Sequence, residues 1–129
     1  MPHRHEAWLA QGRRDFEAAQ HSFDTGSYEW CAYQAQQAAE KALKALLRFH
    51  GREVRGHTLL QLLETVRDFL ATSHELMTAA QELDQHYFRS RYPDSLTSGY
   101  PAEVYDEAIG GECLRYAESI LEFVEKNVS

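Results

Sequence analysis

The sequence of 129 residues has few residues that break helices, since it contains only 3 prolines and 7 glycines. It has no run approaching the roughly 18 apolar residues that a membrane-spanning helix needs. The first ten residues, "MPHRHEAWLA", lack the apolar core of a signal peptide. The 2 cysteines, Cys31 and Cys113, are too few for a disulfide framework. We therefore expect a cytoplasmic protein without a membrane segment, whose cysteines are reduced residues of the core.

Positive charge is also scarce. The chain carries 20 acidic residues against 13 lysines and arginines, and its formal net charge is -7. This balance argues against a protein that coats nucleic acid through bulk electrostatic attraction. The arginines gather at 48–55 and at 89–91, however, so the sequence leaves room for a local basic site.

What the sequence has in abundance is helical periodicity. Hydrophobic residues make up 43% of the chain and charged residues 26%, which is the balance of a globular protein. Apolar residues recur at spacings of three and four, and no segment alternates with the period of a strand. The sequence predicts an all-α fold, an antiparallel bundle of about five helices in a single domain over residues 1–129. The expected helices cover roughly 6–23, 28–50, 58–70, 75–87 and 101–124.

The second expected helix, "SYEWCAYQAQQAAEKALKALLRFHG", has the clearest pattern. Ser27 is a suitable N-cap and Gly51 a suitable stop. Its apolar stripe is rich in alanine along the middle, and small side chains let a neighbouring helix approach closely. We expect this helix at the centre of the bundle.

Further local signals predict where the later helices begin and end. Thr58 with Gln61, and Thr72 with Glu75, match the capping-box pattern that opens a helix. Pro93 predicts that the fourth helix, expected through Tyr87, ends by Tyr92. Pro101 suits the first turn of the last helix. Gly110–Gly111 within that helix predicts a close neighbour or a bend.

Several kinds of chemistry have no matching motif. No Cys-x-x-Cys or His-Glu-x-x-His spacing is present, so we expect no metal and no cofactor. The segment "GREVRG" lacks the Gly-Lys-Ser/Thr of a phosphate-binding loop. Cys113 lies on an apolar stripe, where a thiol is an inert core residue and not a nucleophile.

Three segments together resemble one family. "YQAQQAAEKALKALL", "GHTLLQLL" and "LDQHYFRSRYPD" occur in this order in the HEPN domain of higher-eukaryote and prokaryote nucleotide-binding proteins, in its "RYPD" type. The resemblance runs from about Trp8 to Val124. It implies an antiparallel helical bundle, a homodimer, and a partner protein, often a nucleotidyltransferase, in a toxin–antitoxin-like pair.

The resemblance also implies a test for enzymatic activity. Many HEPN proteins are metal-independent ribonucleases that carry arginine, four to six residues, then histidine. Neither Arg89 nor Arg91 is followed by a histidine at that distance. Arg52 with His57, and Arg67 with His74, match the spacing, but at positions where the family does not place its motif. The sequence thus favours a protein without ribonuclease activity, and the Arg52–His57 pair remains the alternative active site.

The segment "RSRYPD" has two interpretations. In the first, Arg89 and Arg91 only compensate the negative end of a helix, and Asp94 pairs with one of them. In the second, the segment binds a phosphate, because a planar guanidinium fork suits a phosphate and a tyrosine can stack on a base. The residues that we assign to this nucleotide- or phosphate-binding site are Arg89, Arg91, Tyr92, Asp94, Tyr87, His57 and Lys41.

The leading hypothesis is a dimeric HEPN-type protein that binds a nucleotide or RNA phosphate and works with a nucleotidyltransferase. The alternatives are a ribonuclease toxin with a displaced active site and a protein-interaction module without ligand chemistry.

Overall fold

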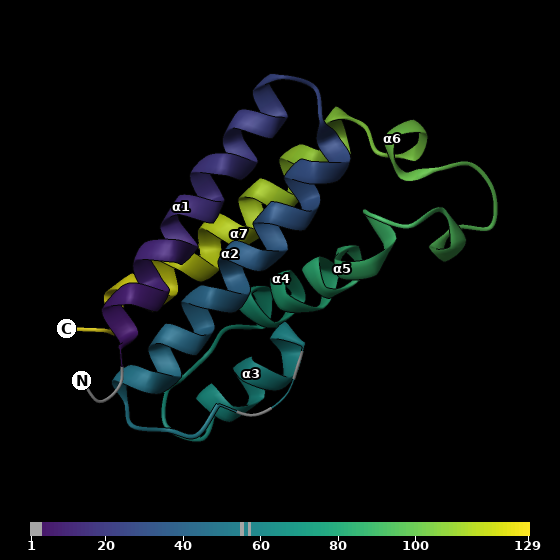
Figure 1. The fold of residues 1–129 in the computed structure, drawn as a ribbon. Coiled ribbons are helices and arrows are strands. Elements are labelled where there is room, and N and C mark those ends of the chain that lie inside the picture. Colours follow the sequence, from purple (N-terminus) through teal and green to yellow (C-terminus); the bar gives the residue numbers. More distant parts are fainter. Residues whose placement is uncertain (1–3, 55, 57) are drawn as a thin grey trace.

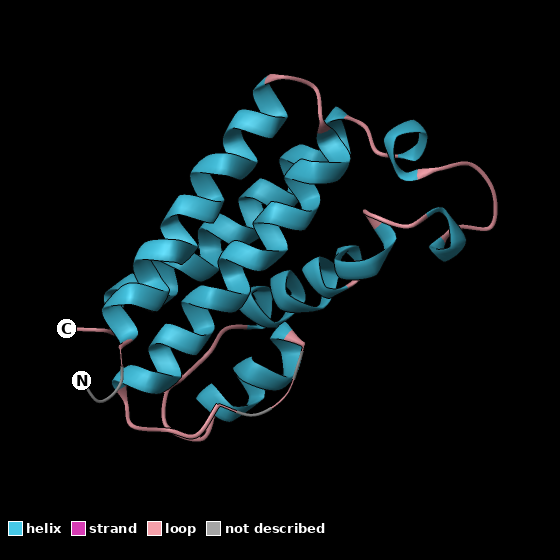
Figure 2. Ribbon diagram, in the orientation of Figure 1, coloured by secondary structure: helices cyan, strands magenta, loops and turns pink. Residues whose placement is uncertain are grey.

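The regular structure is helical throughout the part of the chain that the structure describes (Figures 1 and 2). The computed structural model describes residues 4–54, 56 and 58–129, and it shows no strand among them. The all-α fold expected from the sequence is confirmed. The elements are α1 (His5–Asp24), α2 (Tyr28–Phe49), α3 (Leu59–Val66), α4 (His74–Asp84), α5 (His86–Arg89), the 3-10 turn η1 (Pro93–Ser95), α6 (Pro101–Val104) and α7 (Glu107–Lys126).

The three long helices α1, α2 and α7 form the body of the bundle (Figure 1). The shorter helices α3, α4 and α5 pack along the other side of α2, and the described chain ends lie close to each other at one end of the bundle. None of the described helices has the length and apolar character needed to cross a membrane.

The alanine-rich helix α2 is central, as the sequence predicts. It packs against α1, α3, α4, α5 and α7. A β-carbon added at Gly12 of α1 would lie 3.1 Å from the carbonyl oxygen of Ala38, so the backbones of α1 and α2 are nearly in contact there. The small side chains that permit this packing are all fully buried: Ala32, Ala35, Ala38, Ala39, Ala42 and Ala45.

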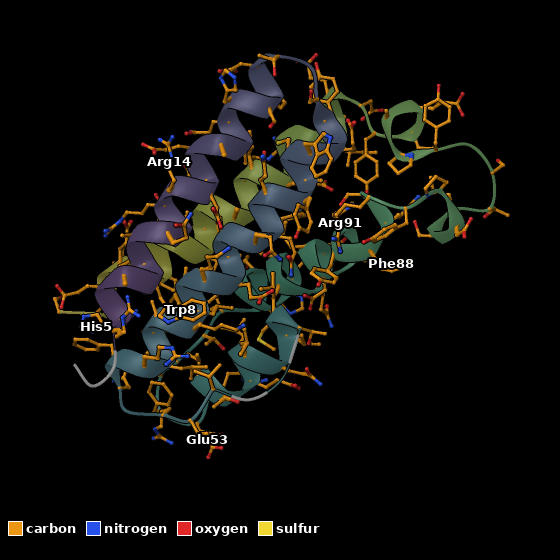
Figure 3. All side chains as sticks on the ribbon, viewed as in Figure 1. His5, Trp8, Arg14, Glu53, Phe88 and Arg91 are labelled. Carbon is orange, nitrogen blue, oxygen red and sulfur yellow. The ribbon has the colours of Figure 1, made fainter. Side chains whose placement is uncertain are left out.

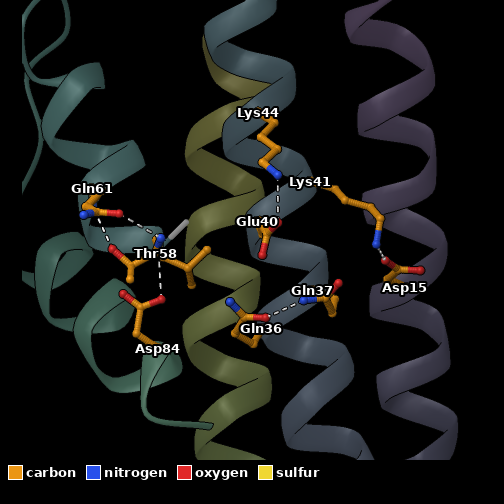
Figure 4. A network of polar contacts seen from close by, with 10 residues as sticks. Asp15, Gln36, Gln37, Glu40, Lys41, Lys44, Thr58, Gln61 and Asp84 are labelled. Carbon is orange, nitrogen blue, oxygen red and sulfur yellow. Dashed lines mark hydrogen bonds and ion pairs between the residues drawn. The ribbon is translucent and has the colours of Figure 1, made fainter. Parts of the chain in front are cut away.

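Of the two predicted capping boxes, only the one at Thr58 is confirmed. The Thr58 hydroxyl accepts from the Gln61 backbone N–H at 3.1 Å, and the Gln61 side chain accepts from the Thr58 backbone N–H at 3.2 Å (Figure 4). The predicted cap at Thr72 is wrong, because Ser73 accepts from the Leu76 N–H and begins α4. Ser27 stands at the N-cap position of α2 without a side-chain hydrogen bond.

The predicted fourth helix is interrupted before Tyr87. Helix α4 ends at Asp84, whose carboxylate accepts from the N–H groups of Leu59 and Leu60 at 2.8 and 3.1 Å. This carboxylate stabilises the positive N-terminus of α3. Gln85 keeps a right-handed helical backbone, so α5 follows α4 in nearly the same direction (Figure 1). Tyr87 therefore lies in α5.

The prediction of one continuous last helix from Pro101 is wrong. Pro101 does occupy the first turn of a helix, but this helix, α6, ends at Val104. Tyr105 and Asp106 have extended backbones, and the Asp106 carboxylate accepts from the Ile109 N–H at 2.9 Å to begin α7. The break places Tyr105 in the core, where it is 5% exposed.

Close packing at Gly110 agrees with the sequence. A β-carbon there would lie 3.2 Å from a Tyr28 ring atom and 3.3 Å from a Phe23 ring atom. Cys31 and Cys113 are both free and buried, as expected, and burial raises the pKa of each thiol to about 12. At neutral pH both thiols are protonated and unreactive.

Candidate functional site

Arg91 lies among three tyrosines just after the end of α5 (Figure 3). Its guanidinium carbon is 4.4 Å from the ring centre of Tyr33, 4.8 Å from that of Tyr87 and 4.9 Å from that of Tyr92. Its Nε donates to the Tyr87 carbonyl at 3.0 Å. Guanidinium groups at such distances are attracted by the electron-rich ring faces. The "RSRYPD" segment thus holds Arg91 in a fixed place against α2.

No carboxylate neutralises Arg91 among the described residues. The ion pairs found there join Arg13 to Glu125, Arg14 to Glu17, Lys41 to Asp15, and Lys44 to Glu40. Asp94, in the turn η1, is exposed and pairs with neither Arg89 nor Arg91 in this part of the chain. Among the described residues, Arg91 contacts three tyrosine rings and the Tyr87 carbonyl. Its terminal N–H groups can therefore bind an anion.

Aromatic side chains continue outward from Arg91. The rings of Trp30 and Tyr33 are 6.2 Å apart, and those of Tyr33 and Tyr87 are also 6.2 Å apart. Phe88 and Tyr92 form a further pair at 4.7 Å. Trp30, Tyr87, Phe88 and Tyr92 are each between 43% and 55% exposed, so these ring faces are open to a ligand. Exposed rings beside a cation are suited to stacking on nucleobases.

Arg89 belongs to a different surface from Arg91. It lines a hollow of about 380 Å³ together with the loop residues Ser95, Leu96, Thr97 and Ser98, and with Val104 of α6. The Ser95 hydroxyl donates to the Tyr92 carbonyl at 2.6 Å and so stabilises the turn that follows the two arginines. The structure therefore divides the predicted arginine pair between two neighbouring places.

His86 and Tyr105 form a buried pair beneath Arg89 that sequence reasoning missed. The Nδ1 atom of His86 lies 2.6 Å from the Tyr105 hydroxyl oxygen. Burial, aided by the nearby positive charge of Arg89, lowers the pKa of His86 to about 4. Burial raises the pKa of Tyr105 to about 12. Both groups are neutral at pH 7, and their contact ties α5 to the segment before α7.

One signal in the sequence pointed to His86. It comes three residues after Leu83, on the buried side of the fourth helical pattern. The burial of its partner Tyr105 was not predicted, because the sequence pattern predicts one continuous helix where α6 and α7 are separated. Tyr33 was also missed, although it follows Trp30 by one helical turn on the partly exposed side of α2.

The remaining predicted residues lie elsewhere or outside the described part. Lys41 extends from α2 towards α1, where its Nζ is 2.6 Å from Asp15 (Figure 4). The guanidinium carbon of Arg52 is 4.5 Å from the ring centre of Phe69. His57 lies outside the described residues. The structure thus gathers Arg91, Tyr87 and Tyr92, and places Lys41 and Arg52 with other neighbours.

Within residues 4–54, 56 and 58–129, no group of three or more histidine, cysteine, aspartate and glutamate side chains is arranged to hold a metal ion. At the Arg91 surface, the guanidinium and the partly exposed ring faces are the groups that can contact a ligand.

Comparison with known proteins gives consistent matches over nearly the whole chain. A family model described as "HEPN domain" matches residues 5–127. The crystal structure of TT1696 from Thermus thermophilus is 38% identical, with a TM-score of 0.93 over 98% of this chain and 99% of that one. The structure of ST0689, an archaeal HEPN homologue, is 37% identical, with a TM-score of 0.84 over 98% of each chain. A Methanocaldococcus jannaschii protein named "Putative toxin MJ1304" is 27% identical over 92% of this chain and 84% of its own length.

Proposed function

Because the chain belongs to the HEPN domain family, we propose that it binds the phosphate group of a nucleotide or of single-stranded RNA at Arg91. The observation that carries this proposal is the position of Arg91: its guanidinium lies among three tyrosine rings and pairs with no carboxylate among the described residues. A cation that is fixed in place and left uncompensated favours an anionic ligand.

The arrangement suits a phosphate that is attached to a base. Arginine presents several N–H donors in one plane, and two of them can bind two oxygens of the same phosphate. Tyr87 and Tyr92 flank the guanidinium with partly exposed rings, and Trp30 extends the ring surface along α2. Stacking on such rings stabilises a bound base by about 1–3 kcal/mol without selecting its identity. The site therefore favours a nucleotide or an unpaired RNA strand over inorganic phosphate.

We further propose a toxin-like role in partnership with a second protein. The Methanocaldococcus jannaschii relative carries the word toxin in its name, which supports this role. The family resemblance indicates a nucleotidyltransferase as the partner and a homodimer as the assembly. In this proposal, ligand binding at Arg91 is the activity that the partner controls.

The experiment that tests the proposal is calorimetric titration with ATP and, separately, with a short single-stranded RNA. The two ligands distinguish a nucleotide site from an RNA site. Arg91→Ala should lower the affinity at least about tenfold, because the charge and the fork are both lost. Arg14→Ala is the matched control, since the Arg14 side chain is 77% exposed and pairs only with Glu17 among the described residues. No binding of either ligand by the wild-type protein, or equal affinity for wild type and Arg91→Ala, would contradict the proposal.

A further inference from the structure

A second group of cations surrounds Trp8, where α1 packs against the C-terminal half of α2. The Nζ atom of Lys44 is 5.5 Å from the centre of the Trp8 ring, and the guanidinium carbon of Arg48 is 4.9 Å from it. Beside the ring lies a hollow of about 360 Å³, lined by Arg4, Ala7, Trp8, Gln11 and Lys41. Four positively charged side chains therefore meet around one tryptophan.

Only two of these four positive charges are paired with a carboxylate among the described residues. Lys41 pairs with Asp15 at 2.6 Å, and Lys44 pairs with Glu40 at 2.8 Å (Figure 4). Arg4 and Arg48 form no ion pair with any carboxylate among the described residues. Two positive charges are thus left over, in a chain whose formal net charge is -7.

Arg48 also has an unsatisfied donor. Its Nε atom is buried and has no hydrogen-bond partner among the described residues. Buried donors in folded proteins nearly always have a partner, so this Nε is an exception, and its burial leaves the terminal N–H groups of Arg48 as the ones that a ligand could reach. The guanidinium of Arg48 lies over the Trp8 ring, so its charge is already positioned.

We propose that the hollow beside Trp8 is an anion site that binds a phosphate monoester or diphosphate group, with Arg4 in its wall as the principal donor and Arg48, beside the Trp8 ring, as a second uncompensated positive charge. A ligand with about two negative charges would balance the two uncompensated arginines, and the guanidinium fork suits phosphate oxygens. Lys41 in the wall and Lys44 beside the Trp8 ring add positive potential while they stay paired with Asp15 and Glu40.

This site is separate from the one at Arg91. Arg91 contacts Tyr33 near the beginning of α2, and Arg48 lies close to the end of this helix. Figure 3 shows Arg91 and Trp8 well apart. At a rise of about 1.5 Å per residue, the two positions on α2 are roughly 22 Å apart along the helix axis. The proposal therefore stands on its own observations and does not depend on ligand binding at Arg91.

The 2 tryptophans of the chain make the two sites separately observable. Trp8 lies in the proposed anion site, and Trp30 lies beside Tyr33 at the Arg91 surface. In the Trp30→Phe protein, Trp8 is the only tryptophan, and its fluorescence reports on the anion site alone.

The test titrates the Trp30→Phe protein with pyrophosphate and with AMP, against sodium chloride at matched ionic strength. We expect a saturable change in Trp8 fluorescence with both phosphate ligands and none with chloride. Arg4→Gln in this background should weaken binding about tenfold, because a charge-assisted donor in the wall is lost, and its exposed position makes a folding defect unexpected. Arg48→Gln should weaken binding several-fold, because an uncompensated positive charge beside the site is lost. Arg14→Gln should leave it unchanged.

Three results would overturn the proposal. The first is the absence of a saturable response to pyrophosphate and AMP. The second is a response to AMP alone, because it would assign recognition to the base and not to the phosphate. The third is equal affinity in the parent protein and in both Arg48→Gln and Arg4→Gln.

Discussion

The guanidinium carbon of Arg91 lies 4.4 Å from the ring centre of Tyr33, which joins the loop after α5 to the middle of the bundle. This contact positions Arg91 from the side of α2, whereas Tyr87 and Tyr92 belong to its own segment. One of the three ring contacts of Arg91 therefore comes from a distant part of the chain.

Replacing Tyr33 should loosen Arg91 without removing its charge. We expect Tyr33→Leu to lower affinity for ATP or RNA several-fold, because a cation–ring contact of about 0.5–1 kcal/mol at a partly exposed site is lost. Tyr33→Phe keeps the ring and should bind like the wild type. Calorimetric titration of the three proteins measures the effect, and equal weakening by both variants would show that the hydroxyl, not the ring, is what Arg91 needs.

Replacement by alanine should change the free energy of unfolding in opposite directions at Gly111 and at Gly12. At Gly111 an added β-carbon has no neighbour closer than 3.6 Å, so Gly111→Ala should raise the free energy of unfolding by about 1 kcal/mol through helix propensity. At Gly12 it would lie 3.1 Å from the Ala38 carbonyl oxygen, which is backbone and cannot move aside. We expect Gly12→Ala to lower the free energy of unfolding by about 1–3 kcal/mol in urea denaturation. Stabilisation by Gly12→Ala would contradict the close approach of α1 and α2.

Buried His86 should make stability depend on pH. Its pKa is about 4 in the folded protein and near 6.5 when exposed, so between these values the unfolded chain binds more protons. The stabilisation is fully present above pH 6.5 and is lost as the pH falls towards 4. At 1.36 kcal/mol per pKa unit, a lowering from 6.5 to about 4 corresponds to a loss of about 3 kcal/mol.

The variant His86→Gln removes this titration. The difference in unfolding free energy between wild type and His86→Gln should therefore shrink between pH 7.5 and pH 4.5. His21→Gln is the control, because His21 is exposed near the end of α1. Parallel pH profiles for wild type and His86→Gln in urea denaturation would show that His86 titrates normally.

The exposed aromatics also bear on assembly. Phe88 is 55% exposed and stacks on Tyr92, and Tyr100 is 54% exposed. We expect a homodimer of about 30 kDa by light scattering at micromolar concentration, twice the 14.9 kDa of one chain. Phe88→Glu should shift the population towards monomer by placing a charge on this surface. A wild-type protein that is monomeric at that concentration would contradict the proposed homodimer.

The features predicted correctly are those that depend on residues close together in the sequence. The Thr58–Gln61 capping box and the alanine-rich stripe of α2 involve neighbours in sequence, and both are found as expected. Two of the wrong boundaries arise because another residue that can cap a helix starts it. Ser73 takes the cap that Thr72 also offered, and the Asp106 cap begins α7 five residues after Pro101.

The candidate site was predictable only in part, for a physical reason. Arg91, Tyr87 and Tyr92 lie within one short segment, so their proximity follows from the sequence. The contacts of Arg91 with Tyr33, and of His86 with Tyr105, join separate helices and depend on how these pack. Lys41 shares its helix with Tyr33, but its charge is directed to Asp15 on α1.

The most direct test of the central claim is the affinity of Arg91→Lys for ATP and for a short single-stranded RNA. Lysine keeps the positive charge but loses the planar fork. Thermal melts should show folding retained, with a change in stability of a few tenths of a kcal/mol. Calorimetric titration should show affinity about tenfold lower than wild type, or about 1.4 kcal/mol. Equal affinities for wild type and Arg91→Lys would contradict recognition of phosphate by the Arg91 fork.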